Sequence, residues 1–401
     1  MFNLLWKKGW QDKWEKKVEM IFPLLAVTSL LLFYTPLVNG YELPKLLFLG
    51  LLVIFGLGYL LESKKVSLPC LYPIALFFAG SVLSAWGALN HYELVLALSL
   101  DLMGISLFWI VVNAVKPMAM EGILWGLSVI GATIALVLIF LPGDQGSVGN
   151  SALAGIFMVP FIPIAVYLAP WGLIPAAIIG IGIYVTNSHA AFLALLVIMA
   201  VMIWRTVPVC PKTIAIIPTV FACLLVLKMG IGADLSIRYR LDWWRNTAHM
   251  VVDHPVFGIG RGNYVVVYPQ YAILGDRVMQ GQANVNRVGQ TIKTAIHSPH
   301  NDYLQLLVEA GPIGLAGFLW FLWMMVDRLK WRTVSKTAKT LALSMLGFLV
   351  TAAFHFPLQT ASGMTLFWVL NGLLWVASEK NIDTDATGFP GGIFPGELDA
   401  G

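Results

Sequence analysis

The stretch His297-Ser-Pro-His-Asn-Asp-Tyr-Leu-Gln-Leu-Leu-Val-Glu-Ala-Gly-Pro-Ile-Gly314 decides how this sequence is interpreted, because a polar loop with two histidines runs directly into an apolar segment. That segment continues to about residue 327 and predicts a helix that crosses a membrane. Ionisable side chains at the mouth of a membrane helix are costly to keep there, so they indicate function by default. We therefore expect chemistry at this loop, on whichever side of the membrane it faces.

The composition predicts the class of the protein. Of its 401 residues, 58% are hydrophobic and only 11% are charged, whereas a soluble domain has about 25% charged residues. We predict an all-α polytopic integral membrane protein in which residues 1–401 form a single membrane domain, with no cleaved signal at the N-terminus. About twelve apolar segments are long enough, or nearly so, to cross a core of about 30 Å. They are 21–39, 43–61, 71–89, 94–115, 122–141, 151–169, 171–187, 189–204, 213–230, 303–327, 340–357 and 362–378.

The distribution of Lys and Arg predicts the orientation. If the N-terminus is inside, most of the 25 basic residues fall on the inner side, and the short outer loops have only Lys45 near them. Cytoplasmic loops attract such an excess, so we expect both termini in the cytoplasm and residues 231–302 as one large outer loop, whose own charges do not count against this topology. The inner basic residues are Lys7, Lys8, Lys13, Lys16, Lys17, Lys64, Lys65, Lys116, Arg205, Lys212, Arg328, Lys330, Arg332, Lys336, Lys339 and Lys380.

Cysteine content and net charge exclude several other classes of protein. Cys70, Cys210 and Cys223 are scattered at or inside the membrane, so they predict neither a disulfide framework nor a cysteine metal site. The net charge of +4 lies mainly on the inner face, where anionic membrane lipid attracts it. We therefore expect membrane lipid and not nucleic acid as its partner. Residues 381–401 are acidic and contain Gly and Pro, which predicts a disordered cytoplasmic tail.

The outer segment 231–302 differs in character from the rest of the chain. It contains seven basic residues, five aspartates and four of the seven histidines, and the other three histidines fall near outer helix ends. This distribution favours an extracytoplasmic reaction compartment. The alternative is that histidines lie at membrane interfaces for ordinary reasons. The histidines are His249, His254, His297 and His300 in the segment, with His91, His189 and His355 elsewhere.

Two local patterns stand out inside this outer segment. Residues 240–253 have helical spacing, and His254-Pro255 ends the helix because proline disfavours helix in the residue before it. Gly258-Ile-Gly-Arg-Gly262 follows as a tight glycine turn, which can bring backbone N–H groups close to an anion. An ordinary turn is the alternative. Several nearby arginines favour an anion site, since guanidinium groups suit phosphate oxygens.

Four landmarks in this sequence resemble the O-antigen ligase and polymerase superfamily, the membrane enzymes that move lipid-linked glycans at the outer face of the bacterial inner membrane. The resemblance covers roughly residues 145–325. Its last landmark is similar to the ligase pattern H-N-x9-G-x-x-G. The landmarks are Gly149-Asn150 with Leu153-Ala-Gly and Pro160, Thr186-Asn-Ser-His189, Arg240-Leu-Asp-Trp-Trp244 with Asp253-His-Pro-Val-Phe-Gly-Ile-Gly260, and His300-Asn301 with Gly311-Pro-Ile-Gly314.

The resemblance implies a GT-C-like helical fold, an active site on the periplasmic face and no cofactor. It implies an undecaprenyl-diphosphate-linked glycan as donor and a lipid A-core sugar, or another glycan, as acceptor. One position departs from the family pattern, because His189 stands where the family usually has an arginine that helps to hold the lipid diphosphate. A protonated His189, Arg238 or Arg261 would have to supply the missing charge.

The residue types fit this chemistry without the family name. A leaving diphosphate needs positive charge, and the acceptor hydroxyl needs a base. We assign the diphosphate first to Arg240, with Arg238, Arg261 and His189 as helpers, because an arginine is permanently charged. His300 is our candidate base, since histidine titrates near neutral pH. The supporting residues are Asn301, Asp302, His297, Trp244, Gly311 and Gly314.

A metal site is a weaker interpretation of the same histidines. His297 and His300 could hold one ion, but no third ligand stands at motif spacing. Arginines also take the place that a divalent cation would occupy on a diphosphate. We therefore predict a metal-independent enzyme.

Two other functions remain open at this point. A polymerase would use the same lipid-linked donor and pass the glycan to another lipid-linked repeat. A solute transporter is the rival of another class, because some members of the superfamily are described as carriers. Carriers commonly have internal repeats and charges at the membrane midplane; we find no convincing repeat here, and charged residues are almost absent from the middle of the predicted spans.

Overall fold

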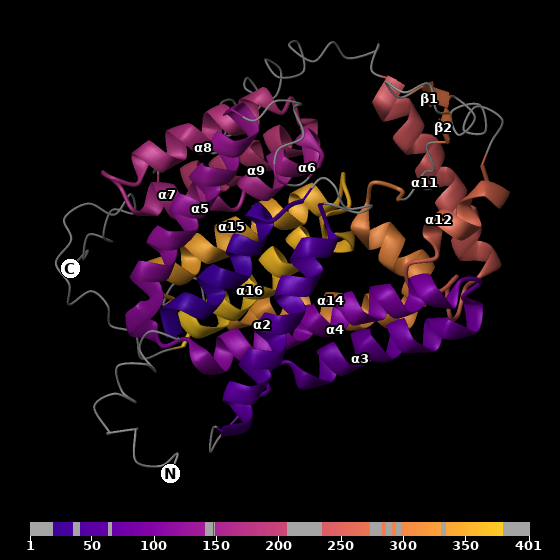
Figure 1. The fold of residues 1–401 in the computed structure, drawn as a ribbon, viewed down its shortest axis with the longest axis horizontal. Helices are drawn as coiled ribbons and strands as arrows, with labels where there is room; N and C mark the ends of the chain where they lie inside the picture. The colour runs from indigo at the N-terminus through magenta and orange to yellow at the C-terminus, as the bar shows by residue number, and fades with distance from the viewer. Residues whose placement is uncertain are drawn as a thin grey trace.

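A computed structural model describes residues 19–34, 41–62, 66–140, 147, 149–206, 235–272, 283–285, 291–293, 298–329 and 334–379. Most of these residues form one bundle of apolar helices, and α11, α12 and two short strands gather at one end of it (Figure 1). Figure 1 also shows α3, α4 and α14 running side by side, with α5 to α9 grouped in another part of the bundle.

The helices of the bundle follow the chain in order. An apolar helical segment, Glu19–Leu31, begins the described chain, and the predicted tail 381–401 lies outside the described residues. The bundle elements are α2 (Leu43–Glu62), α3 (Leu71–Leu83), η3 (Ser84–Gly87), α4 (His91–Ala114), η4 (Pro117–Ala119), α5 (Met120–Phe140), α6 (Ser151–Met158), α7 (Phe161–Tyr167), α8 (Leu173–Val185), α9 (His189–Thr206), α14 (Asp302–Arg328), α15 (Lys336–Ala352), η7 (Pro357–Gln359) and α16 (Ala361–Ala377).

The outer segment has its own elements. They are α11 (Leu235–Asp253), α12 (Tyr264–Val267), η6 (Tyr268–Gln270), β1 (Ala283–Val285) and β2 (Thr291–Lys293). The two strands pair antiparallel, with Asn284 opposite Ile292. The sequence does not predict this pair. The prediction of a helical membrane protein is confirmed, and within the described ranges this pair is the one departure from helix and loop.

Helix length and composition support four of the twelve predicted spans. Four helices are long and apolar enough to cross a membrane: Leu43–Glu62, His91–Ala114, Pro117–Phe140 and Asp302–Arg328. The other predicted segments coincide with shorter apolar helices or with α15, except 213–230, which lies outside the described residues. Twelve spans therefore stay a prediction, as does the outer location of residues 231–302.

Proline explains why one predicted segment is short of a full span. Residues 151–169 are expected as a single helix, but α6 ends at Met158 and α7 begins at Phe161. Pro160 stands at the junction and has no N–H to continue the hydrogen-bond ladder. The start of α6 is well defined, because the Asn150 side chain accepts a hydrogen bond from the N–H of Leu153 at 3.1 Å.

Small residues bring α3 and α14 unusually close, and this pair has the most extensive helix contact in the bundle. A Cβ at Gly80 would overlap the backbone of Gly314, and a Cβ at Gly317 would overlap the backbone of Phe77. Close backbone approach through small residues is a common way of packing helices in membranes, where burial of apolar surface gives little drive. Gly314 of the predicted motif thus has a packing role.

A small second core attaches the outer segment to the bundle. Met250, Ile259, Tyr264, Tyr268 and Val308 are fully buried in it. Val308 belongs to α14, so α11 and the loop after it pack directly on the helix that follows His300. This packing fixes the outer segment relative to the candidate site.

Candidate functional site

The chain turns sharply at His300 immediately before α14 begins. His300 has a φ of 55°, in the left-handed region that a residue with a Cβ rarely adopts. Asn301 then caps the helix, because its side chain accepts the N–H of Leu304 at 3.0 Å. On the other side of the turn, the indole N–H of Trp244 donates to the carbonyl of Pro299 at 2.9 Å. The cap and the Trp244 contact hold His300 between α11 and α14.

The His300 ring lies in an aromatic box that three segments build. Trp243 of α11 stacks on it with ring centroids 4.8 Å apart, and Phe356 meets it edge-on at 5.0 Å. His355 is also 5.0 Å away, at an interplanar angle of 57°. Phe356 and His355 come from the turn between α15 and α16, which connects the last part of the chain to the site.

Hydrogen bonding favours one tautomer of His300. Its Nδ1 lies 3.3 Å from the carbonyl oxygen of Ser298. A carbonyl only accepts, so this contact requires the proton on Nδ1 and leaves a lone pair on Nε2. The backbone N–H of His300 donates to the Ser298 hydroxyl at 3.0 Å and keeps the turn in place. An imidazole in this state can accept a proton through Nε2.

Burial and a nearby arginine keep both imidazoles of this site neutral. Burial, followed by the positive charge of Arg240, lowers the pKa of His300 to about 4. The pKa of His355 is well below its usual value for the same reason, with His300 and Arg240 adding to the effect of burial. Arg240 is therefore near enough for its charge to act on the His300 imidazole, and its assignment to the diphosphate stays a prediction.

A break in α14 explains the first glycine of the motif. Gly311 has a φ of 68°, and Pro312 after it has no N–H, so the carbonyls of Val308 and Glu309 lose their helical partners. Backbone N–H groups of the glycine turn donate hydrogen bonds to these two carbonyls instead. The N–H of Ile259 donates to Val308 at 2.8 Å, and that of Gly260 donates to Glu309 at 3.2 Å. A Cβ at Gly311 would lie 2.5 Å from the carbonyl oxygen of Val256.

The glycine turn therefore docks against a broken helix. Its backbone N–H groups at Ile259 and Gly260 are used by α14, so these two groups do not present themselves to an anion. The predicted anion role of the turn has no support from these groups, and an ordinary structural turn accounts for them.

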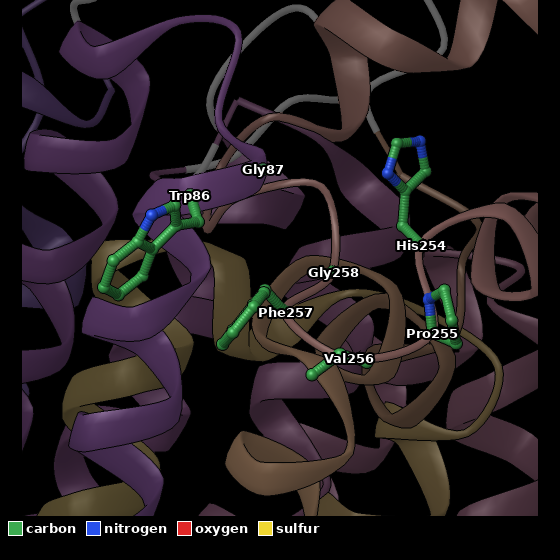
Figure 2. A pocket seen from close by; sticks show the side chains of 7 residues that line it. All are labelled: Trp86, Gly87, His254, Pro255, Val256, Phe257 and Gly258. Atoms are coloured by element: carbon green, nitrogen blue, oxygen red, sulfur yellow. The ribbon is translucent and has the colours of Figure 1, made fainter.

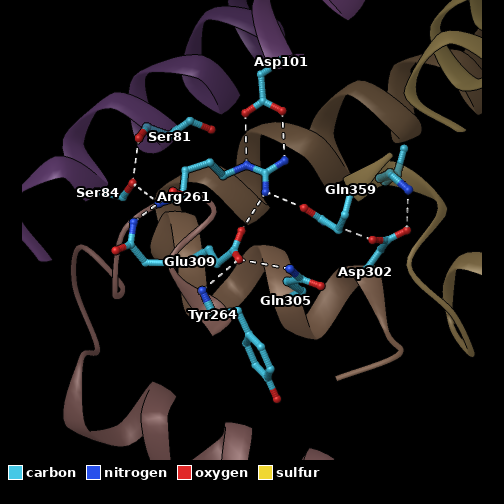
Figure 3. Close-up of polar contacts among 11 residues, drawn as sticks. Ser81, Ser84, Asp101, Arg261, Tyr264, Asp302, Gln305, Glu309 and Gln359 are labelled. Atoms are coloured by element: carbon cyan, nitrogen blue, oxygen red, sulfur yellow. Dashed lines mark hydrogen bonds and ion pairs between the residues drawn. The ribbon is translucent and has the colours of Figure 1, made fainter. Parts of the chain in front are cut away.

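Arg261 is buried at the centre of a polar network, with 3% of its surface exposed. Its Nε and Nη2 donate to the two oxygens of Asp101 at 3.0 and 2.9 Å. Its Nη1 donates to Glu309 at 2.7 Å and to the side-chain oxygen of Gln359 at 2.8 Å (Figure 3). Burial disfavours a charged guanidinium, but Asp101 and Glu309 outweigh it and raise the pKa of Arg261.

This environment differs from the diphosphate contact expected for Arg261. Two carboxylates already neutralise its charge, and its guanidinium faces α4, α14 and the η7 turn. The physical reason for the difference is that Asp101 and Glu309 are distant in sequence and leave no local pattern beside the glycine turn. Arg261 is a structural clamp in this fold.

Asp302 extends the same network toward His300. Its carboxylate accepts the N–H of Leu358 at 2.9 Å and the side-chain amide of Gln359 at 3.0 Å. These bonds fix the 355–359 turn against the first residue of α14 (Figure 3). Asp302 therefore orients the turn that carries His355. Among the described residues, no hydrogen bond joins its carboxylate to the His300 imidazole.

His189 is the first residue of α9, and the residues just before it pack against α6. Gly155 of α6 lies against Thr186 and Ser188, just before His189. Phe157, two residues further along α6, lies against Gly363, whose other close neighbour is Pro357 of the turn. α6 thus contacts both the segment before His189 and the turn after His355. The replacement of the family arginine by His189 stays a prediction.

Two of the predicted site residues have side chains outside the described part of the structure. His297 lies outside the described residues, and the side chain of Arg238 in α11 is outside the described part of the structure. Among the residues that are described, no group of three or more His, Cys, Asp or Glu side chains is arranged to hold a metal ion. Metal independence remains a prediction.

A shallow hollow lies beside the glycine turn, away from His300. It has a volume of about 210 Å³ and is lined by Trp86, Gly87 and residues 254–258. Figure 2 shows the Trp86 and Phe257 rings on one side and His254 on the other. The two rings are 5.5 Å apart. His300, Arg240 and His355 do not line this hollow.

The sequence interpretation misses His355. The only signal in the sequence is its predicted position near an outer helix end, which it shares with several other histidines. Only the packing of the 355–359 turn against α14 reveals that it adjoins His300.

Comparison with protein-family models finds a match over part of the chain. A search among curated proteins finds no match. Residues 174–319 match the family model described as O-antigen ligase (Wzy_C). This range includes α11, the glycine turn, His300 and the Gly311–Gly314 motif, so the resemblance inferred from the sequence is confirmed. The chain carries the domain of the O-antigen ligase superfamily over residues 174–319.

Proposed function

We propose that this protein is an O-antigen ligase-like glycosyltransferase, which moves a glycan from undecaprenyl diphosphate to a hydroxyl of a lipid A-core sugar. The reaction takes place on the periplasmic face of the bacterial inner membrane, in a multi-pass protein with both termini in the cytoplasm. The pairing of a neutral, half-buried His300 with the nearby charge of Arg240 carries the proposal. The family domain that contains both residues supports it.

The proposed reaction needs one base and one cation. Nε2 of His300 takes the proton of the acceptor hydroxyl while the acceptor oxygen forms a bond to the anomeric carbon of the donor. The bond from that carbon to the diphosphate oxygen breaks, and its electron pair stays on the diphosphate. Arg240 faces the developing negative charge, with His189 and Arg238 as helpers. The imidazolium then releases its proton to water.

Arg240 also links donor binding to the strength of the base. Without donor, its positive charge disfavours a second positive charge on His300. A bound diphosphate neutralises Arg240 and adds negative charge, which favours imidazolium. His300 therefore becomes a stronger base once the donor is in place. We leave Arg261 out of the diphosphate site, because Asp101 and Glu309 already use its charge.

The transporter alternative has one observation in its favour. Asp101 and Glu309 lie inside α4 and α14, and buried ionisable groups in membrane helices often mark a transport path. This finding differs from the expectation that mid-span charges are almost absent. However, both carboxylates are paired with Arg261, as in a structural network. Uptake of radiolabelled solute into vesicles, set against glycan transfer in detergent, separates the two functions.

The polymerase alternative differs only in the acceptor. Purified protein is incubated with lipid-linked glycan and, separately, with lipid A-core or with a second lipid-linked repeat. A ligase caps the lipid A-core with glycan, and a polymerase produces a ladder of longer lipid-linked products. Gel analysis of the products distinguishes the two outcomes.

We expect Arg240→Lys to damage transfer strongly although it keeps the positive charge. Lysine cannot make the planar two-pronged contact of guanidinium with phosphate oxygens. The loss is expected on the order of 10-fold or more in kcat/KM for the donor, about one charge-assisted hydrogen bond. Arg245→Lys is the matched control, because Arg245 is an exposed arginine of the same helix. Equal behaviour of the two variants would remove the support for Arg240 at the diphosphate.

The proposed topology has a direct test with cysteine labelling. Gly9→Cys and Gly275→Cys are made separately in a background whose three native cysteines are replaced by serine. A membrane-impermeant thiol reagent added to intact spheroplasts is expected to label the cysteine at position 275 and not the one at position 9. Labelling of both from outside would contradict the periplasmic site.

A further inference from the structure

His355 is a buried imidazole that the proposed mechanism does not use. It lies between α15 and η7 and is 4% exposed. Its ring centroid is 5.0 Å from that of His300 and 4.6 Å from that of Phe356. The turn that carries it is tied to α14 by Asp302 through Leu358 and Gln359. His355 is therefore held beside the candidate base by a network of buried hydrogen bonds.

The tautomer of His355 is opposite to that of His300. Its Nδ1 accepts the backbone N–H of Phe356 at 3.1 Å, so the proton of the neutral ring lies on Nε2. In His300 the contact of Nδ1 with the Ser298 carbonyl puts the lone pair on Nε2. The two adjacent rings thus present one donor and one acceptor.

These two Nε2 atoms have no hydrogen bond to any part of the chain that the structure describes. His355 is only 4% exposed as a residue, yet its Nε2 is not among the described polar atoms that are both fully buried and without a partner, so this N–H is open to a ligand. Phe354 and Phe356 on either side show that this turn accommodates apolar rings. A ligand that accepts the Nε2–H would explain why position 355 has an imidazole and not an apolar ring.

We propose that His355 binds the glycan acceptor, by donating its Nε2–H to a sugar oxygen next to the hydroxyl that His300 deprotonates. The inference rests on the proposed transferase function. Neighbouring oxygens on a sugar ring offer one acceptor and one O–H donor side by side, which matches the donor and acceptor of the two imidazoles. The ligand class is a glycan with an oxygen adjacent to the attacking hydroxyl. His355 positions that glycan and takes no proton.

A diphosphate oxygen would also accept the Nε2–H of His355, so the test must separate acceptor from donor. Initial rates of transfer are measured with purified protein while the lipid-linked donor and the lipid A-core acceptor are varied in turn. His355→Phe keeps an aromatic ring and removes the N–H. We expect the acceptor KM to rise on the order of 10-fold, about the worth of one neutral hydrogen bond, with the donor KM unchanged.

A second pair of variants keeps the test valid if His355→Phe does not fold. His355→Gln and His355→Met have similar side-chain length, but only glutamine offers an N–H donor. We expect glutamine to hold the acceptor more tightly than methionine, while thermal unfolding of the two in detergent is similar. His249→Phe, at an exposed histidine of α11, is the control and is expected to match wild type.

The outcomes are distinct. An equal acceptor KM for the glutamine and methionine variants, or a rise in the donor KM instead, would overturn the role of His355. The proposed glycosyltransferase function would still stand after either result, provided that wild type transfers glycan and His300→Ala does not. An inactive wild type with every acceptor overturns the proposed function and the role of His355 with it.

Discussion

Replacement of His300 by alanine is expected to lower the rate of glycan transfer by about 10²–10⁴, the usual contribution of a general base. Binding of the lipid-linked donor should stay close to wild type, because Arg240 and not the imidazole faces the diphosphate. The two effects are measured separately, by initial rates at saturating acceptor and by donor binding in detergent. The alanine substitution should leave only a small cavity, because the His300 side chain is half-buried between Trp243, His355 and Phe356.

A second substitution separates a base from a positioning group. His300→Gln keeps a hydrogen-bonding side chain but accepts no proton near neutral pH, so a base predicts that both variants are inactive. Partial rescue by glutamine would indicate positioning only. His249→Ala should be silent, and EDTA should leave wild type unchanged if the enzyme is metal-independent. Full activity of His300→Ala would leave the transferase without its base and favour the transporter.

The pH profile of wild type adds a check on the same residue. A base works in its deprotonated form, and the pKa of His300 is lowered from 6.5 to about 4 by burial and then by Arg240. The kcat/KM of the free enzyme should therefore stay high as pH falls through 6.5 and decline only near pH 4. Burial, together with His300 and Arg240, also lowers the pKa of His355 well below its usual value. The kcat reports the donor-bound enzyme and should decline at a higher pH. In that complex the bound diphosphate offsets the charge of Arg240 and so raises the pKa of His300.

The position of α14 and its first turn could be predicted from the sequence. Asn301 is a strong helix cap, an apolar run follows it, and both signals lie within a few residues of each other. The same locality explains why most apolar segments coincide with helices. The break at Gly311 is harder to predict, because Gly-Pro inside an apolar run is compatible with a kinked helix or with an end. The partner of the break, the turn at Ile259 and Gly260, is remote in sequence.

The roles of Arg261 and His355 could not be predicted, since both depend on contacts between distant residues. Arg261 and Asp101 are 160 positions apart, and no local pattern connects them. An arginine between two glycines has the same sequence pattern whether it holds a phosphate or a buried carboxylate. His355 is separated from His300 by the whole of α14 and α15. Tertiary packing alone distinguishes these alternatives.

The buried network around Arg261 gives the second large expected effect. Arg261→Met removes the guanidinium that pairs with Asp101 and Glu309, both of which are buried. Breaking a buried pair by removing one partner costs about 3–5 kcal/mol, because the other charge is left uncompensated. We expect a large fall in the thermal stability of the purified protein in detergent. Arg245→Met, at an exposed position of α11, should leave stability close to wild type.

A triple variant tests whether the lost stability comes from the uncompensated carboxylates. Arg261→Met combined with Asp101→Asn and Glu309→Gln removes all three charges, so no uncompensated charge is left buried. The triple variant should therefore be more stable than Arg261→Met alone. If Arg261 bound diphosphate instead, Arg261→Met would fold normally and lose only donor binding. A stable Arg261→Met protein with weak donor affinity would support Arg261 as a diphosphate-binding residue. An unstable Arg261→Met protein that the two amide substitutions stabilise would show instead that Arg261 holds the glycine turn against α4 and α14.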